Sequence, residues 1–212
     1  MKKIGVVVPT LFSRNGYLRI CLESIQQAGS AHVLVMGPNP ENNLKNFAGL
    51  YDQCLEEPND GTLSSKLNLA LDSLPDHVEL ITWIGDDDLL AMGSLDYLQK
   101  QFEESTNTIL IYGSCGYIDS SGNRIGMNKS GKWAMKLAHF GPFLAPQPGS
   151  LFRRDAFRSA GGLDPKLNFA FDFDLFMALR RVGKVEYLNK ELASFRWHKN
   201  SLTVGQRKAS VN

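Results

Sequence analysis

Strand-like and helix-like segments alternate through the first half of the chain, and this alternation limits the possible folds more than any other feature. Continuous apolar runs, typical of strands buried on both faces, lie at residues 4–8, 33–36, 80–84 and 108–112. Between them, residues 17–25, 63–74 and 95–102 repeat apolar side chains with the spacing of an amphipathic helix. Strand–helix–strand order predicts an α/β fold in which helices flank a central, mostly parallel sheet.

The pattern weakens after residue 112. Ser, Gly and Asn at 120–123 predict a hairpin turn, and residues 173–182 and 185–188 predict one more helix and strand. Residues 129–148, rich in Gly, Pro and aromatic side chains, predict a long loop or short helices beside a binding cleft. No repeat or linker is visible, so we expect a single domain over residues 1–212, with a mobile polar tail at 205–212.

Composition excludes several classes of protein. The 212 residues contain 23 Lys and Arg against 22 Asp and Glu, a balance that argues against nucleic acid as the partner. Three widely separated cysteines without metal-site spacing indicate reduced thiols. No run approaches the roughly 18 apolar residues of a membrane span, and the short N-terminal run is typical of a strand and not of a secretory leader. We therefore expect a cytoplasmic protein without a transmembrane segment.

An acidic triplet, Asp86, Asp87 and Asp88, directly follows the apolar run at 80–84. In open α/β sheets, ligands bind at the carboxyl ends of the strands. Adjacent carboxylates repel one another, and a hard cation such as Mg²⁺ or Mn²⁺ would relieve that repulsion while also binding phosphate oxygens. The alternative is a solvated turn that caps the next helix. The position after a buried strand favours a metal–diphosphate site.

A second acidic pair, Asp172 and Asp174, lies among phenylalanines at 169–176. Aromatic neighbours would desolvate a carboxylate and raise its pKa toward the range of a general base. The alternative is that Asp172 is the N-cap of the helix predicted at 173–182, and the local pattern alone favours this cap.

Seven short motifs follow one another along the chain. They are Val-Pro-Thr at 8–10, Asp-Gly at 60–61 with Asn68, Trp-Ile-Gly-Asp-Asp-Asp at 83–88, Pro-Gly-Ser-Leu-Phe-Arg at 148–153, Gly-Gly-Leu-Asp at 161–164, Phe-Asp-Phe-Asp-Leu at 171–175 and Arg-Trp-His at 196–198. In this order they resemble the inverting family-2 glycosyltransferases of the GT-A (nucleotide-diphospho-sugar transferase) fold, over residues 3–203.

The resemblance implies how the chain is organised and which residues bind the donor. Residues 1–112 would form the nucleotide-sugar part, and residues 113–204 the acceptor side with the catalytic base. The residues implied in donor binding are Pro9, Thr10, Arg14, Asp60, Asn68, Asp86 and Arg196. Asp87 corresponds to the metal ligand of the DxD motif, although the triplet allows a shift by one residue; Asp88 and His198 are the other implied ligands.

The resemblance also implies the reaction. Asp172 would be the catalytic base, while residues 147–150 and the Gly161–Gly162 turn would line the acceptor side. A sugar would pass with inversion from a nucleotide-diphospho-sugar, by family default a UDP-sugar, to a glycan or lipid-linked acceptor in the synthesis of lipopolysaccharide, capsule or exopolysaccharide. The acid that often follows the second strand is absent, because residues 36–39 read Met-Gly-Pro-Asn, so the base of the nucleotide stays open.

Two other functions stay open beside this one. A non-catalytic protein of the same fold would bind a nucleotide-sugar or a glycan, and a sugar-nucleotide pyrophosphorylase is disfavoured because the loop at 9–14 lacks glycines. Scattered basic side chains are typical of a solvated surface, but they would also suit peripheral association with the inner face of an anionic membrane. These are Lys129, Lys132, Lys136, Arg207 and Lys208.

Overall fold

The computed structural model describes residues 2–128, 131 and 145–197. Its strands are β1 (Ile4–Pro9), β2 (Ala31–Gly37), β3 (Gln53–Glu56), β4 (Leu80–Trp83), β5 (Leu89–Leu90), β6 (Thr108–Ile118), β7 (Arg124–Asn128), β8 (Leu151–Arg153) and β9 (Lys184–Arg196). Its helices are α1 (Asn15–Ala28), α2 (Pro40–Asn43), the 3₁₀ helix η1 (Lys45–Phe47), α3 (Leu63–Asp72), α4 (Ser94–Glu104), α6 (Arg154–Ser159) and α7 (Phe171–Val182).

All of these strands belong to one sheet, in the order β3-β2-β1-β4-β8-β6-β9-β5, with β7 paired to β6. The pairs β3–β2, β2–β1, β1–β4 and β6–β9 are parallel. Strand β8 lies antiparallel between β4 and β6, and β5 and β7 also pair antiparallel. Because β1 to β4 run in the same direction, their carboxyl ends open at one edge of the sheet.

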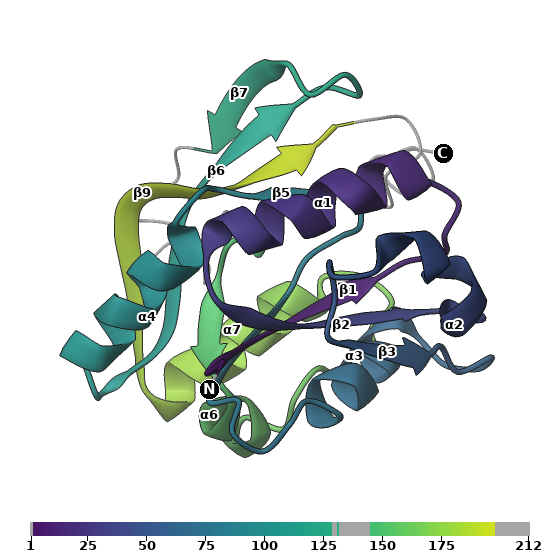
Figure 1. Cartoon of the computed structure of the whole chain (residues 1–212). Coiled ribbons are helices and arrows are strands. Elements are labelled where there is room, and N and C mark those ends of the chain that lie inside the picture. The colour runs from purple at the N-terminus through teal and green to yellow at the C-terminus, as the bar shows by residue number, and fades with distance from the viewer. Residues whose placement is uncertain (1, 129–130, 132–144, 198–212) are drawn as a thin grey trace, which may run out of the picture.

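Helices cover both faces of the sheet, as the sequence predicts (Figure 1). One buried cluster joins the sheet to α1 and α4, and a second joins it to α3, α6 and α7. Strand β1 contributes to both clusters, since Val6 and Val8 face the first and Val7 faces the second. This two-sided burial explains why residues 4–8 are continuously apolar.

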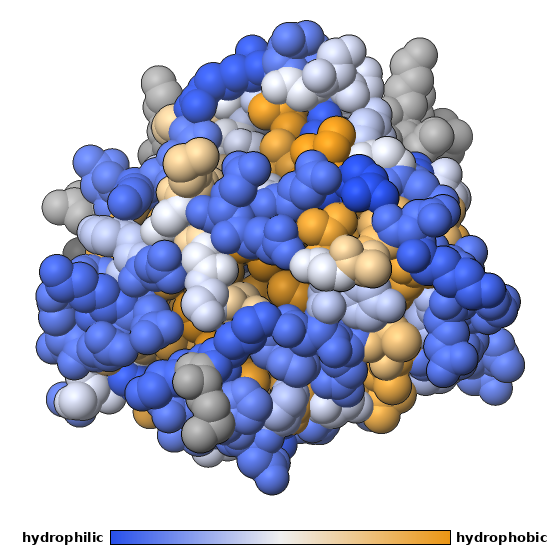
Figure 2. All heavy atoms as spheres, in the orientation of Figure 1, coloured by the Kyte–Doolittle hydropathy of each residue, from blue (hydrophilic) through white to orange (hydrophobic). Residues whose placement is uncertain are grey.

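Unlike the two buried clusters, the face of the molecule drawn in Figure 2 is largely hydrophilic, with scattered hydrophobic side chains. Within the described ranges, no helix has both the length and the apolar character needed to cross a membrane. The five basic residues considered for membrane contact, Lys129, Lys132, Lys136, Arg207 and Lys208, lie outside those ranges, as does the tail at 205–212.

Several elements differ from prediction. Helix α7 begins at Phe171, two residues early, because Ala170 adopts a left-handed conformation with φ of 57°. Strands β6 and β9 extend to Ile118 and Arg196, well beyond the predicted segments. The hairpin turn is confirmed, since the backbone N–H of Asp119 donates to the carbonyl of Asn123 between β6 and β7. Most of the loop predicted at 129–148 lies outside the described residues.

Candidate active site at the carboxyl ends of the strands

The loop after β1 and the acidic triplet after β4 lie side by side because β1 and β4 are parallel neighbours, with Val7 opposite Trp83. The Thr10 hydroxyl donates to Asp86 Oδ2 at 2.7 Å, and the Thr10 backbone N–H donates to the Met36 carbonyl at 2.8 Å. A side chain on Gly37 would collide with the Thr10 carbonyl oxygen. Glycine at the end of β2 therefore lets this loop lie against the sheet, at the place where the sequence lacks an acid.

Arg14 joins two of the three carboxylates. It occupies the N-cap position of α1, and its guanidinium donates to Asp86 Oδ1 and to Asp87 Oδ2, each at 2.8 Å. Both aspartates are buried, with 4% and 9% of their surface exposed. A guanidinium thus supplies positive charge to the pair that was predicted to need a cation.

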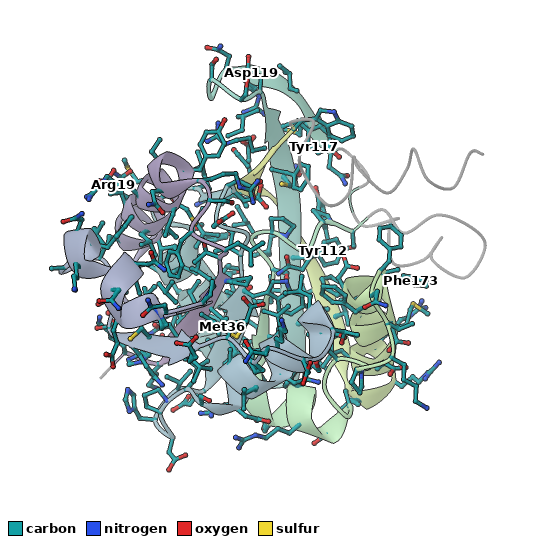
Figure 3. The ribbon with its side chains drawn as sticks, turned by 90° about the vertical axis from the view of Figure 1, so that its right-hand side faces the viewer. Arg19, Met36, Tyr112, Tyr117, Asp119 and Phe173 are labelled. Carbon is teal, nitrogen blue, oxygen red and sulfur yellow. The ribbon has the colours of Figure 1, made fainter. Side chains whose placement is uncertain are left out.

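Arg196 holds the triplet from the opposite side. Its backbone N–H donates to Asp88 Oδ1 at 2.8 Å, and its Nε donates to the Asp87 carbonyl at 2.8 Å. Its Nη1 donates to the carbonyl of Asp119, at the tip of the β6–β7 hairpin (Figure 3), at 2.9 Å. The guanidinium also lies 4.5 Å from the centre of the Tyr17 ring. Arg196, only 3% exposed, therefore connects β9, the acidic loop, the hairpin and α1.

Asp88 is as deeply buried as Asp86, each with 4% of its surface exposed. Burial, and then the charge of Asp87, raise the pKa of its carboxyl well above the ordinary value. The same burial raises the pKa of the nearby Cys21 thiol, and raises that of Cys115 to about 12. Both thiols therefore stay protonated at neutral pH, and both are free, as the expectation of reduced thiols requires.

Asp172 lies at the second residue of α7, and not at the N-cap, which is Ala170. Burial raises the pKa of its carboxyl, although the Phe173 backbone N–H donates to Oδ1 at 2.9 Å. The Phe171 ring lies 6.2 Å from the Trp83 ring at the end of β4, so the N-terminus of α7 is at the same edge as the triplet. A half-buried carboxyl with a raised pKa beside this edge suits proton transfer, whereas Asp174 is exposed.

A set of side chains on α3 holds the segment that leads into α7. Asn68 makes two hydrogen bonds to the backbone of Leu163, through Nδ2 at 2.7 Å and Oδ1 at 2.9 Å. The hydroxyls of Thr62 and Ser64 donate to the carbonyls of Pro165 and Leu167. In this structure the Asn68 amide thus contacts the segment before Asp172. The sequence contains no signal for the contacts of Thr62 and Ser64, which are ordinary helix-start residues.

The remaining predicted residues fall into three groups. Asp60 is exposed in the loop between β3 and α3, and Pro9 ends β1, so both lie at the strand ends. Gln147 is buried and donates to the Trp83 carbonyl at 2.8 Å, which brings the 147–150 segment to the same edge. His198 lies outside the described residues.

The carboxylates suit a hard cation in chemistry, though not as a ready-made cage. Across the described part of the chain, no three Asp, Glu, His or Cys side chains converge as a metal site. The three carboxylates of the triplet instead accept hydrogen bonds from arginines: Asp86 and Asp87 from Arg14, and Asp88 from the backbone N–H of Arg196. Mg²⁺ commonly uses one or two carboxylates and completes its shell with water and substrate phosphates, so the oxygen ligands present fit such an ion.

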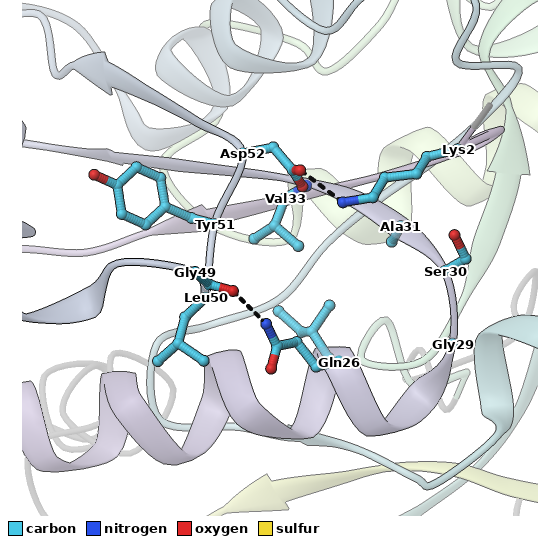
Figure 4. Close-up of a pocket in the computed structure, with 11 residues that line it drawn as sticks. Lys2, Gln26, Gly29, Ser30, Ala31, Val33, Gly49, Leu50, Tyr51 and Asp52 are labelled. Atoms are coloured by element: carbon cyan, nitrogen blue, oxygen red, sulfur yellow. Dashed lines mark hydrogen bonds and ion pairs between the residues drawn. The ribbon is translucent and has the colours of Figure 1, made fainter.

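A separate small cavity of about 150 Å³ lies at the other end of the sheet (Figure 4). It is lined at the amino ends of β1 and β2 by residues that include Lys2 and Ala31. Lys2 Nζ pairs with Asp52 Oδ1 at 2.6 Å across it. This cavity is therefore not part of the candidate site, which lies at the carboxyl ends of the strands.

The fold is shared with solved glycosyltransferases that have GT-A-like folds. S. aureus TarS 1–349 in complex with UDP-GlcNAc superposes with a TM-score of 0.72 and 15% identity, covering 95% of this chain and 60% of TarS 1–349. The mannosyltransferase PcManGT from Pyrobaculum calidifontis, in complex with GDP-Man and Mn²⁺, gives 0.67 and 10%, covering 98% and 61%. The chain thus spans about 60% of the length of these two structures.

This likeness confirms the predicted fold class, an α/β domain with the GT-A-like architecture. No protein-family model matches the chain. No curated protein matches its sequence either.

Proposed function

We propose that the chain is an inverting, metal-dependent glycosyltransferase that uses a nucleotide-diphospho-sugar. One observation supports this most directly: the acidic triplet and the half-buried carboxyl of Asp172 lie at the same edge of the sheet, joined by the Trp83–Phe171 contact. This is the edge at which open α/β sheets bind ligands. The two similar structures are complexes with UDP-GlcNAc and with GDP-Man, which favours a nucleotide-sugar donor here.

Asp172 is the proposed catalytic base. Its carboxylate takes the proton of the acceptor hydroxyl as that oxygen attacks the anomeric carbon. The bond from that carbon to the diphosphate oxygen breaks on the opposite side, and the nucleoside diphosphate leaves with the bonding electrons. The raised pKa keeps the carboxylate a stronger base than an exposed aspartate.

Donor binding is assigned to the loops after β1, β3 and β4, with Pro9, Thr10, Arg14 and Asp60 beside the nucleotide and Asp86 toward the ribose. A bound Mg²⁺ or Mn²⁺ would supply Lewis-acid stabilisation to the departing diphosphate. Its proposed ligands are Asp87, then Asp88 through Oδ2, since Oδ1 accepts from Arg196, and His198. Arg196 holds the acidic loop in place, and Asn68 supports the site from α3.

The proposed acceptor is a glycan or a lipid-linked sugar in surface-polysaccharide synthesis, reached from the cytoplasm or the inner face of the membrane. UDP is the default nucleotide. The second candidate is a non-catalytic protein that binds nucleotide-sugars on the same fold. The Arg14 bridge is the observation that favours it, because a guanidinium already offsets part of the charge of Asp86 and Asp87 without a metal.

Two measurements test the proposal. Calorimetric titration with UDP-, GDP-, CDP- and dTDP-sugars, each with and without Mn²⁺, should find one nucleotide that binds tightly only with metal. With that donor and an acceptor present, the rate of nucleoside diphosphate release should fall about 100-fold or more in Asp172→Asn, while donor binding is retained. Asp174→Asn, an exposed carboxylate two residues away, is the matched control and should stay near wild type.

The outcomes separate the two candidates. Donor binding without turnover in the wild type, over a wide set of acceptors, would favour the binding protein. Full activity in Asp172→Asn would remove the proposed base, and binding of no nucleotide at all would refute the donor class.

A further inference from the structure

Arg14 reaches the carboxylates from a different part of the chain. It belongs to the start of α1, 72 residues before Asp86, and its side chain is 31% exposed while those of Asp86 and Asp87 are 4% and 12% exposed. The guanidinium therefore enters from the surface and covers two buried carboxylates, donating one nitrogen to each. The Arg14 side chain is thus partly exposed, unlike the two carboxylates that it contacts.

Arg14 supplies positive charge directly to two carboxylates of the site. Among the described residues, the three carboxylates of Asp86, Asp87 and Asp88 face the guanidinium groups of Arg14 and Arg196, so these five ionised groups together carry one net negative charge. The buried Arg196 side chain donates to the backbone carbonyls of Asp87 and Asp119. Within the described part of the chain, Arg14 is the cation that pairs with the carboxylates of Asp86 and Asp87.

A divalent cation on the same oxygens would stand a few ångströms from the Arg14 guanidinium. At about 5 Å, repulsion between +2 and +1 charges corresponds to a factor of about 10⁵ in affinity at an effective dielectric constant of about 20, and of about 17 at that of water, about 80. Because Arg14 is partly exposed and salt screens the charges, we expect an effect near the lower figure, about tenfold. Free metal is therefore opposed at the carboxylates as long as the guanidinium stays there.

We propose that Arg14 is an exchangeable counter-ion that couples metal binding to donor binding. Without donor, it offsets part of the charge of Asp86 and Asp87 and keeps the affinity for a free divalent cation low. When a diphosphate enters, its negative charge draws the guanidinium away from Asp87, and the carboxylate becomes available to the cation that arrives with the donor. Because coupling is reciprocal, nucleotide and metal each raise the affinity for the other. This inference rests on the proposed metal-dependent donor binding.

The test measures binding and needs no turnover. Mn²⁺ is titrated into wild type, Arg14→Met, Arg14→Lys and Arg19→Met, with free Mn²⁺ followed by electron paramagnetic resonance, first without and then with nucleoside diphosphate. Arg19 lies on the same helix but pairs with Glu23 and the Asn46 carbonyl, so its variant removes an equal charge away from the site. Thermal unfolding checks that each variant is folded.

Without nucleotide, Arg14→Met should bind Mn²⁺ about tenfold more tightly than wild type, and Arg19→Met should match wild type. Arg14→Lys, which keeps the charge but cannot span both carboxylates, should fall between them and tests the idea even if the Met variant fails to fold. Equal Mn²⁺ affinity in wild type and the Arg14 variants would overturn the counter-ion role while leaving the proposed function intact, provided that nucleotide still recruits Mn²⁺. Absence of Mn²⁺ binding in every protein, with every nucleotide, would refute the metal-dependent function and this inference with it.

Discussion

Replacing Arg196 by Met should destabilise the protein far more than its position at the end of a strand suggests. The guanidinium is almost fully buried and donates to backbone carbonyls of the acidic loop and of the β6–β7 hairpin. Met retains much of the apolar stem, so the packing of the side chain is largely preserved. The change therefore isolates the loss of the charged donors and of the contact with the Tyr17 ring.

The magnitude follows from the contacts of Arg196. Two hydrogen bonds from a charged donor, at 2.8 and 2.9 Å, are worth about 1.5–3 kcal/mol each. The ring contact at 4.5 Å adds about 0.5–2 kcal/mol. Water that reaches the vacated carbonyls offsets part of this loss, so we expect the free energy of unfolding to fall by about 3–5 kcal/mol. That is a large share of the roughly 5–15 kcal/mol typical of a folded domain.

Urea denaturation measures this loss as a lower midpoint with an unchanged slope. Arg19→Met is the matched control, because Arg19 also donates to a carbonyl, of Asn46, and also lies over a ring, of Phe47 at 5.0 Å, but it is exposed. We expect its loss to stay below about 1 kcal/mol. If the two variants were destabilised equally, the argument that burial makes the Arg196 contacts strong would be refuted.

Three further predictions concern the surroundings of the site. Gly37→Ala should lower stability by about 1–3 kcal/mol in thermal or urea unfolding, because the new methyl group meets the Thr10 carbonyl; Gly16→Ala, with open space around it, should be neutral or stabilising. Asn68→Ala should lower kcat more than it raises the KM for donor, and an unchanged kcat with a raised KM would instead indicate direct nucleotide contact. In the pH profile, kcat/KM should fall on acidification as Asp172 is protonated. Because burial raises the pKa of Asp172, this loss should occur at higher pH than for an ordinary aspartate. If Asp172→Glu retains activity, the acid limb of its profile should move.

The sequence predicts the long elements of the fold but not the short ones. Strands β1, β2 and β4 are buried throughout or nearly so, which leaves continuous apolar runs in the sequence. Strands β5 and β8 have two and three residues, too few to show a period. The extension of β6 contains Gly113, where a Cβ would lie 2.5 Å from the Lys190 carbonyl oxygen, so close backbone approach and not apolar pattern decides the structure there.

The position of the candidate site follows from the sequence, whereas its electrostatics do not. A parallel sheet brings loop residues after β1 and β4 to one edge, so the proximity of Thr10 to Asp86 is expected from topology. The partners of the carboxylates depend on side-chain directions across 72 residues for Arg14 and 108 for Arg196, which no local pattern contains. The orientation of Asn68 toward Leu163 is equally invisible in the sequence.

This difference changes what the acidic triplet implies. Repulsion among adjacent carboxylates favours a nearby cation of either kind, a metal ion or a guanidinium. In this structure the guanidinium of Arg14 lies against Asp86 and Asp87. The triplet alone is therefore weak evidence for metal dependence. The stronger reason is the charge of the donor, because a diphosphate placed beside buried carboxylates adds negative charge that Arg14 alone would not neutralise. On the proposed function, the demand for a metal arises when the donor binds, so metal binding should be measured with the nucleotide present.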